Sequence, residues 1–156
     1  MGRQNSTNVP APCEFQISGL TLELDCLVES KVEAISPVVD DLMRTIRDHQ
    51  CLHGNEFEVE TAMRESLANA IVHGNQQDPR KLVRICCACQ KDGGVLIIVK
   101  DGGKGFDPNT VPSPVTGQNI CLRHGRGIYL LNLLMDEVHF EKGGTEIHMR
   151  KGTASA

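Results

Sequence analysis

Three polar side chains recur one helical turn apart in the stretch ESLANAIVH, residues 65–73. Glu65, Asn69 and His73 stand at i, i+4 and i+8, so on a helix they share one face. The amide oxygen of Asn69 suits Mg²⁺, which takes hard oxygen ligands and keeps several of its waters. A carboxylate one turn earlier could act as a general base without binding the metal. The alternative interpretation is a solvated glutamate, a surface asparagine and a histidine at the edge of the core.

A glycine-rich turn, DGGKGF at residues 101–106, follows an apolar run. The carboxylate of Asp101 is a hydrogen-bond acceptor, for example for the exocyclic amine of adenine. Gly103 and Gly105 let the backbone approach a flat ring and adopt positive φ. An ordinary turn between two strands is the alternative interpretation of this segment.

A third segment, RHGRG at residues 123–127, opens an apolar stretch with helical character. Backbone N–H groups and the helix dipole at such a start favour phosphate. Arg123 and Arg126 could add charge-assisted hydrogen bonds to a terminal phosphate. A flexible linker with solvated arginines is the alternative. Taken together, the three segments predict a site for a magnesium-bound nucleotide.

The composition indicates an ordinary soluble globular domain. The chain has 156 residues, of which 40% are hydrophobic and 23% charged. This length suits one domain with its own core. The formal net charge is -4, aromatic residues make up 3%, and there is no Trp. These values argue against a nucleic-acid binder, which needs a basic surface or stacking platforms. The apolar runs fall well short of the roughly 20 residues of a membrane helix.

The chain has seven cysteines, an odd number, and no secretory segment precedes them. This favours reduced thiols in the cytoplasm. Cys86, Cys87 and Cys89 fall on an expected strand, where alternation sends Cys87 and Cys89 to one face and Cys86 to the other. Their spacing differs from the paired cysteines of zinc sites, so we interpret them as small buried hydrophobic residues.

The expected elements follow the order β, α, α, β, β, loop, α, β, β. They comprise strand structure over 14–27, helices 37–50 and 56–73, strands 82–90 and 95–100, a loop over 102–124, a helix from 128 to 135, and strands 137–142 and 145–151. Ser36 with Pro37 predicts the start of the first helix. Asn55 with Glu58 resembles a capping box, and Gly74 is expected to end the second helix.

Hairpins at 92–94 and 143–144 imply a largely antiparallel sheet. We therefore expect an α+β fold, a two-layer sandwich whose mostly antiparallel mixed sheet carries helices on one face. Residues 1–13 are expected to form a loose N-terminal tail, 14–151 a single domain, and 152–156 a short C-terminal tail.

In order and spacing, these segments resemble the N box and the two glycine boxes of the GHKL ATPase superfamily, which has the Bergerat fold. The resemblance runs from about 56 to 151 and rests on ESLANAIVHGN, VKDGGKGFDP, GRGIYLLNLLMDEV and GGTEIHMRK. The chain looks most like the bacterial anti-sigma-factor serine kinase branch.

The resemblance implies that ATP or ADP lies between the helix of Glu65 and the 102–127 loop. Asn69 would hold Mg²⁺, and Glu65 would be the catalytic base. Asp101 would recognise adenine, with Gly103 and Gly105 beneath the ring. The remaining residues implied around the nucleotide are His73, Phe106, Arg123, Gly125, Arg126, Gly127, Ile128 and Thr145. Among these, Arg123 would reach the terminal phosphate and Thr145 would lie near the adenine-binding acid.

The resemblance also implies partners, namely a sigma factor and a STAS-type anti-sigma factor antagonist, with a homodimer compatible with it. Direct binding to nucleic acid or membrane is not implied. The chain lacks the phosphoacceptor-histidine helix pair of sensor histidine kinases, and its lid is short. Pro37 of the first helix differs from the branch at a position where a contact with the sigma factor is expected.

Three functions therefore compete. The first is an ATP-dependent serine/threonine kinase that regulates transcription by partner switching. The second is a binding module that grips a partner when nucleotide orders it, without chemistry. The third is a relative of the fold that binds no nucleotide and works by protein contact alone.

Overall fold

The computed structural model describes residues 9–105 and 123–153, and for residues 123–126 the backbone alone. Its sheet has five strands in the order β1-β2-β3-β5-β4, and each neighbouring pair is antiparallel. The strands are β1 (Leu20–Glu29), β2 (Leu82–Gln90), β3 (Val95–Lys100), β4 (Glu137–Glu141) and β5 (Glu146–Lys151). The strands of the two expected hairpins therefore pair as the sequence predicts.

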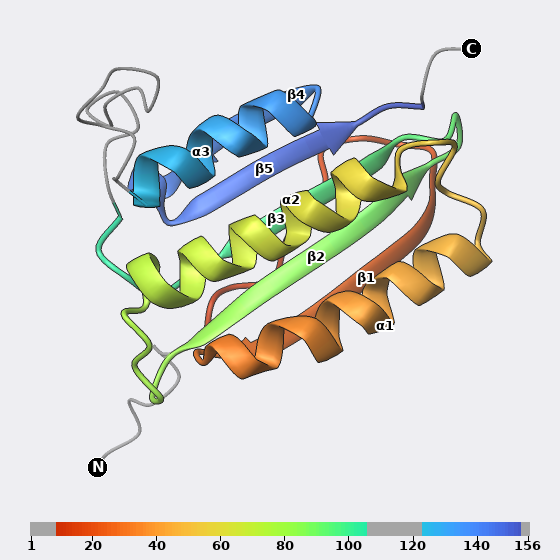
Figure 1. Cartoon of the computed structure of the whole chain (residues 1–156). Helices are drawn as coiled ribbons and strands as arrows, with labels where there is room; N and C mark the ends of the chain where they lie inside the picture. Colours follow the sequence, from red (N-terminus) through yellow and green to blue (C-terminus); the bar gives the residue numbers. More distant parts are fainter. Residues whose placement is uncertain (1–8, 106–122, 154–156) are drawn as a thin grey trace.

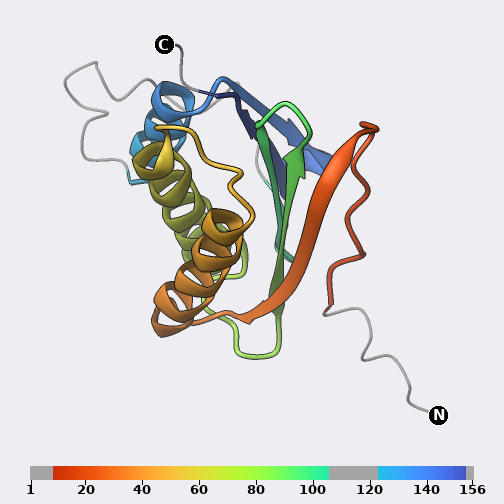
Figure 2. The same cartoon turned by 90° about the vertical axis from the view of Figure 1, so that its right-hand side faces the viewer.

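The helices all lie on one face of this sheet (Figures 1 and 2). They are α1 (Ile35–Asp48), α2 (Glu56–Ala68) and α3 (Arg123–Leu134), with short 3-10 turns η2 (Val32–Ala34) and η6 (Lys142–Gly144) and a π-helical turn η3 (Asn69–Gly74). The two-layer α+β expectation is confirmed. Among the described strands the sheet is wholly antiparallel rather than mixed.

The core lies between the helix layer and the inner face of the sheet. Alternate residues of β2 and β3 point inward, among them Ile85 and Ile97, which are fully buried. Val59, Met63 and Leu67 of α2 pack against them from the helix layer. Full burial of such a side chain stabilises the fold by about 1.5–3 kcal/mol. This packing fixes α2 over the centre of the sheet.

The start of α1 differs from the expectation. Ala34 occupies the N-cap position, while Ser36 and Pro37 lie inside the first turn. The Ser36 hydroxyl instead accepts a hydrogen bond from Arg64 Nη1 at 3.0 Å. The predicted start at residue 37 is wrong: η2 leads directly into α1, so the helix already begins at Ile35.

Asn55 does precede α2, but it does not form a capping box. Its Oδ1 accepts a hydrogen bond from the His53 N–H at 3.2 Å, and its Nδ2 donates to the Gly152 carbonyl at 2.6 Å. No side-chain hydrogen bond caps the helix. Asn55 is 1% exposed, so it ties the chain that follows β5 to the start of α2. Gly152 was expected to belong to a loose tail.

The cysteines contradict the expectation of reduced thiols. Cys13 is bonded to Cys86, and Cys51 to Cys89. Among the described cysteines, Cys26 and Cys87 are free. The expected faces are confirmed, since Cys87 and Cys89 belong to the main core and Cys86 does not. The disulfides were missed because both partners come from distant segments, and spacing within residues 86–89 carries no information about them.

Residues 9–19 cross the face of the sheet opposite the helices (Figure 2). The sequence predicted strand structure from residue 14, but β1 begins at Leu20. Residues 10–13, expected to be a loose tail, are held on the sheet by Arg84, Lys100 and Cys86.

Candidate functional site

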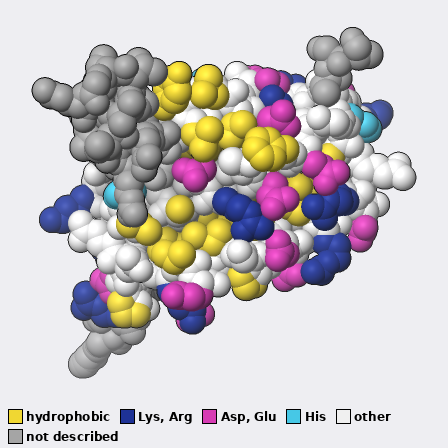
Figure 3. Space-filling model, in the orientation of Figure 1, with side chains coloured by type: hydrophobic (Ala, Val, Ile, Leu, Met, Phe, Trp, Pro, Cys, Tyr) yellow, Lys and Arg dark blue, Asp and Glu magenta, His cyan; other side chains and the backbone are white. Residues whose placement is uncertain are grey.

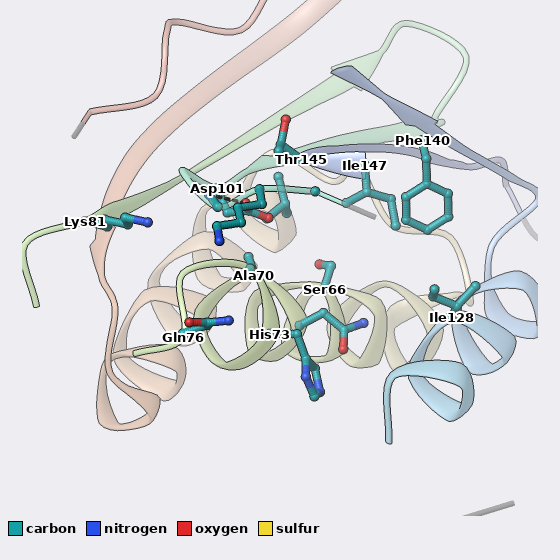
Figure 4. A pocket seen from close by; sticks show the side chains of 16 residues that line it. Ser66, Ala70, His73, Gln76, Lys81, Asp101, Ile128, Phe140, Thr145 and Ile147 are labelled. Carbon is teal, nitrogen blue, oxygen red and sulfur yellow. Dashed lines mark hydrogen bonds between the residues drawn. The ribbon is translucent and has the colours of Figure 1, made fainter. Parts of the chain in front are cut away.

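A cavity of about 240 Å³ lies between the end of the α2 helix and the ends of β3 and β5. Figure 4 shows its side chains coming from both layers. Asp101, Lys81 and Thr145 make one part polar, while Phe140, Ile147 and Ile128 make another part apolar. A cavity with an apolar wall and a few polar groups suits a flat heterocycle with polar edges.

Asp101 lies at the polar part, directly after β3. Its backbone N–H donates to the Thr145 carbonyl at 3.0 Å, and its Oδ1 accepts a hydrogen bond from the Gly103 N–H at 2.8 Å. Burial raises the pKa of this carboxyl to about 6, although the Gly103 N–H and the charge of Lys81 lower it. A carboxylate kept from water in a cavity is a candidate for ligand recognition.

The glycines of this region allow segments to approach closely. A Cβ at Gly103 would overlap the carbonyl of Gly74, and a Cβ at Gly74 would overlap the Asp101 carboxylate. Gly105 has φ +81° and lies against the Gly143 carbonyl, so a side chain there is excluded on two grounds. The turn after β3 therefore packs against both η3 and the turn before β5.

The helix that carries the polar triplet widens where it reaches the cavity. The sequence predicted a helix over 56–73, but α2 ends at Ala68 and continues as the π-helical turn η3. The wider turn shows in the Asn75 N–H, which donates to the carbonyl of Ala70, five residues earlier, at 2.7 Å. Gln76 and Gln77 then have φ of 53° and 56°. Such turns and left-handed residues are frequent at functional sites.

Asn75 holds this turn in place, and sequence reasoning missed it. Its Oδ1 accepts a hydrogen bond from the Gly102 N–H at 2.7 Å, and its Nδ2 donates to Ser30 Oγ at 2.8 Å and to the Leu82 carbonyl at 3.1 Å. The side chain is buried, with 1% exposed. The only feature of the sequence that pointed to Asn75 was its position directly after Gly74, in the motif HGN.

Replacing Asn75 by Ala is expected to lower the free energy of unfolding by about 2–4 kcal/mol. The change removes three hydrogen bonds of a side chain that is 1% exposed, to the Gly102 N–H, the Leu82 carbonyl and Ser30 Oγ, and leaves a cavity in their place. Urea unfolding monitored by circular dichroism measures the loss. The control is Asn132→Ala, because Asn132 is exposed and makes one local bond to the Ile128 carbonyl. Equal stability of the two variants would contradict this role of Asn75.

Asn69 borders two hollows at once. It lines the cavity and also a groove of about 780 Å³ between α2 and α3. Gly127 of α3 lies so close that a Cβ there would be 2.8 Å from Asn69 Nδ2. Gly127 is thus the position where α3 approaches the Asn69 amide, consistent with the predicted meeting of the two segments.

Glu65 lies in the groove and not in the cavity. Its side chain is half-buried, and among the described residues no side chain pairs with its carboxylate. Val32, Val72 and Leu133 supply apolar walls to the same groove. Figure 3 shows hydrophobic side chains among charged ones on this helix side. A carboxylate there can meet a group that enters from outside.

The structure brings together much of the predicted site. The cavity lining includes Asn69, His73, Asp101, Gly103, Gly105, Ile128 and Thr145. The His73 ring points away from Asp101 (Figure 4). Phe106 lies outside the described residues, and for Arg123, Gly125 and Arg126 the structure describes only the backbone of α3. Lys81, Lys104 and Gln76 also line the cavity and were not predicted.

This fold and cavity agree with the comparison with known proteins. The chain belongs to the family described as histidine kinase-like ATPase domain, whose model matches residues 28–151. Within it, the chain belongs to the anti-sigma factor branch, and it is an ATP-binding protein of that type. It is 30% identical over 133 residues to the anti-sigma F factor of Heyndrickxia coagulans, covering 81% of this chain and 80% of that protein.

A second relative, the anti-sigma F factor of Clostridium novyi (strain NT), is 30% identical over 149 residues, which cover 86% of this chain and 96% of that protein. Among solved structures, the RsbU and RsbW domains of Rv1364c from Mycobacterium tuberculosis match with a TM-score of 0.59 and 19% identity. That match covers 85% of this chain and 32% of the other, and it supports the fold. Within the described residues, none of the helices has the length and hydropathy to cross a membrane.

Adenine-nucleotide affinity is expected to fall as the pH drops below about 6. Asp101 has a raised pKa of about 6, so it takes up a proton there and loses the charge that favours an amine donor. The expected loss approaches tenfold per pH unit below 6. Titration calorimetry with ADP between pH 7.5 and 5 measures it. The terminal phosphate titrates nearby, so the Asp101→Asn profile is the reference, and matching profiles would contradict the assignment.

Proposed function

We propose that this protein is a serine/threonine kinase that uses ATP to phosphorylate a STAS-type anti-sigma factor antagonist, and that it also binds a sigma factor. The observation that supports it most is the pairing of two adjoining hollows. One contains Asp101 and the glycine turn, and the other contains Glu65. Asn69 borders both. The similarity to anti-sigma F factors supports the same choice of partners.

In this proposal the cavity holds the adenosine end of ATP. Asp101 accepts a hydrogen bond from the adenine amine, and Thr145 adds a polar group beside it. The apolar side chains of Ile128 and Ile147 pack on the ring. Gly103 and Gly105 have no side chains, so at these positions the backbone itself can face the ring.

The phosphate end is assigned to the start of α3. Gly125 lies in the first turn of α3, where backbone N–H groups have no partner within the helix and can face phosphate, with Arg123 and Arg126 as the cations. Gly127 lets the helix approach Asn69 and the phosphates closely. The protein offers few ligands for Mg²⁺, since no cluster of three His, Cys, Asp or Glu side chains is found among the described residues. Asn69 alone would hold it, and Mg²⁺ would neutralise phosphate charge. One protein oxygen suffices when phosphate oxygens complete the shell.

The hydroxyl of the antagonist would enter through the groove. Glu65 would take the proton of this hydroxyl as its oxygen attacks the terminal phosphoryl group, and ADP would leave. Val32 and Leu133 on the walls of the groove are 47% and 64% exposed, and a bound antagonist would cover them. Positioning and charge neutralisation supply most of the acceleration in phosphoryl transfer.

Transfer of label from γ-labelled ATP to an antagonist of the same organism tests the proposal. The expected result is one labelled Ser or Thr on the antagonist and release of ADP. Intact ATP after long incubation, together with partner affinity that depends on nucleotide, would instead establish the non-catalytic binding module. Absence of ATP binding in calorimetry would remove both.

A further inference from the structure

The face of the sheet opposite the helices has an apolar centre. Cys86, Ala88, Leu96 and Ile98 point to this face and are 2%, 1%, 8% and 3% exposed. Cys86 pairs with Ile98 across the ladder, and Ala88 with Leu96. None of the four belongs to the main core under the helices. Their burial therefore requires a cover on the other side.

The cover is residues 9–19, here called the strap. It makes three bonds with the sheet: Arg84 Nε donates to the Pro10 carbonyl at 3.0 Å, Lys100 Nζ donates to the Pro12 carbonyl at 3.0 Å, and Cys13 is bonded to Cys86. Between strap and sheet lies a groove of about 620 Å³, with Phe15 on one wall. Figure 2 shows the strap running along this face.

Little else holds the strap. Most of its residues are exposed, and only Pro10, Cys13 and Phe15 are half-buried. Within the described chain, no backbone hydrogen bond joins residues 9–18 to any strand, and the first one is accepted by the Gly19 carbonyl from the Lys91 N–H at 3.0 Å. The covalent link therefore carries most of the attachment.

We propose that the Cys13–Cys86 disulfide is a redox-controlled latch: a dithiol reductant cleaves it, the strap leaves the sheet, and the apolar centre becomes an open surface. This control site is separate from the nucleotide cavity, and it does not depend on the proposed kinase activity.

The chemistry follows from the unequal burial of the two sulfurs. A thiolate of the reductant attacks the Cys13 sulfur, because Cys13 is half-buried while Cys86 is 2% exposed. Cys86 leaves as a thiolate and takes up a proton. The second thiol of the reductant then attacks the reductant's own sulfur in the mixed disulfide, and Cys13 leaves as a thiolate that takes up a proton. The protein gains two electrons and two protons, and the reductant becomes a cyclic disulfide.

The other disulfide provides an internal comparison. Cys51 and Cys89 are 4% and 1% exposed and lie in the main core. Access limits thiol–disulfide exchange, so this bond is cleaved only when the core opens. The latch is therefore the bond that responds under native conditions.

Timed reduction with dithiothreitol, alkylation and mass spectrometry tests the latch on the whole protein after oxidative purification. Cys13 and Cys86 are expected to be alkylated at least tenfold faster than Cys51 and Cys89. Chymotrypsin cleavage after Phe15, which is half-buried against the sheet, should become at least tenfold faster in the same interval. Equal reduction rates, a reduced strap that chymotrypsin cuts no faster, or free Cys13 in oxidised protein would each overturn the proposal.

Variants separate the latch from general loosening of the fold. Cys13→Ser should show the fast chymotrypsin cleavage of the strap without reductant, and it should keep the melting behaviour of the helix layer. Cys26→Ser is the matched control, since Cys26 is free and half-buried; its strap should be cut as slowly as that of the wild type. A strap in Cys13→Ser as resistant as in the control would show that the bond does not hold it.

Discussion

Replacing Asp101 by Asn is expected to weaken binding of ADP by about 100-fold. The substitution keeps the size of the side chain, and its Oδ1 can still accept the Gly103 N–H. The atom left to face adenine is then an amide NH₂, which confronts another donor. A hydrogen bond to a charged group contributes about 1.5–3 kcal/mol, and losing it gives a change of this order. Titration calorimetry at pH 7.5 measures it.

The variant is expected to fold at least as well as the wild type. Burial raises the pKa of Asp101, so folding favours the protonated carboxyl. The contribution of the protonated Asp101 carboxyl to the free energy of unfolding is complete below its ordinary pKa of 3.8. It is lost as the pH rises through the folded-state pKa of about 6. Above pH 6, a neutral amide thus removes an unfavourable buried charge. Asp48→Asn, at an exposed position, is the control. An affinity within threefold of wild type would contradict the adenine assignment.

The fold was predictable because its signals are local and periodic. The strands predicted at 82–90 and 95–100 are observed at those bounds, since both are apolar runs flanking a glycine turn. Helix boundaries were less accessible. The start of α1 depends on η2, and the end of α2 depends on a π-helical turn that no residue pattern marks.

The site was predictable where a motif has side-chain chemistry of its own, as with Asp101 and Asn69. Asn75 could not be found this way, because two of its three hydrogen bonds reach Ser30 and Gly102, which are far away along the chain. The Cys13–Cys86 bond has a sequence separation of 73. Contacts of this kind form only when the chain has folded, so residue spacing in the sequence does not reveal them.

Replacing Glu65 by Gln is expected to slow phosphoryl transfer by about 10²–10⁴-fold, the usual contribution of a positioned general base. ADP affinity should stay within about threefold of the wild type, because Glu65 lines the groove and not the cavity. Single-turnover transfer of labelled phosphate to the antagonist measures the first quantity, and calorimetry the second. Glu58→Gln is the matched control on the same helix.

The separation of the two hollows makes this outcome specific. If Glu65 instead bound the nucleotide, the substitution would change affinity and transfer together. If it were a surface residue without a role, neither would change, and the proposed base would be wrong. A loss of transfer at constant affinity is the result that requires a carboxylate facing the incoming hydroxyl, with Asn69 between it and the nucleotide.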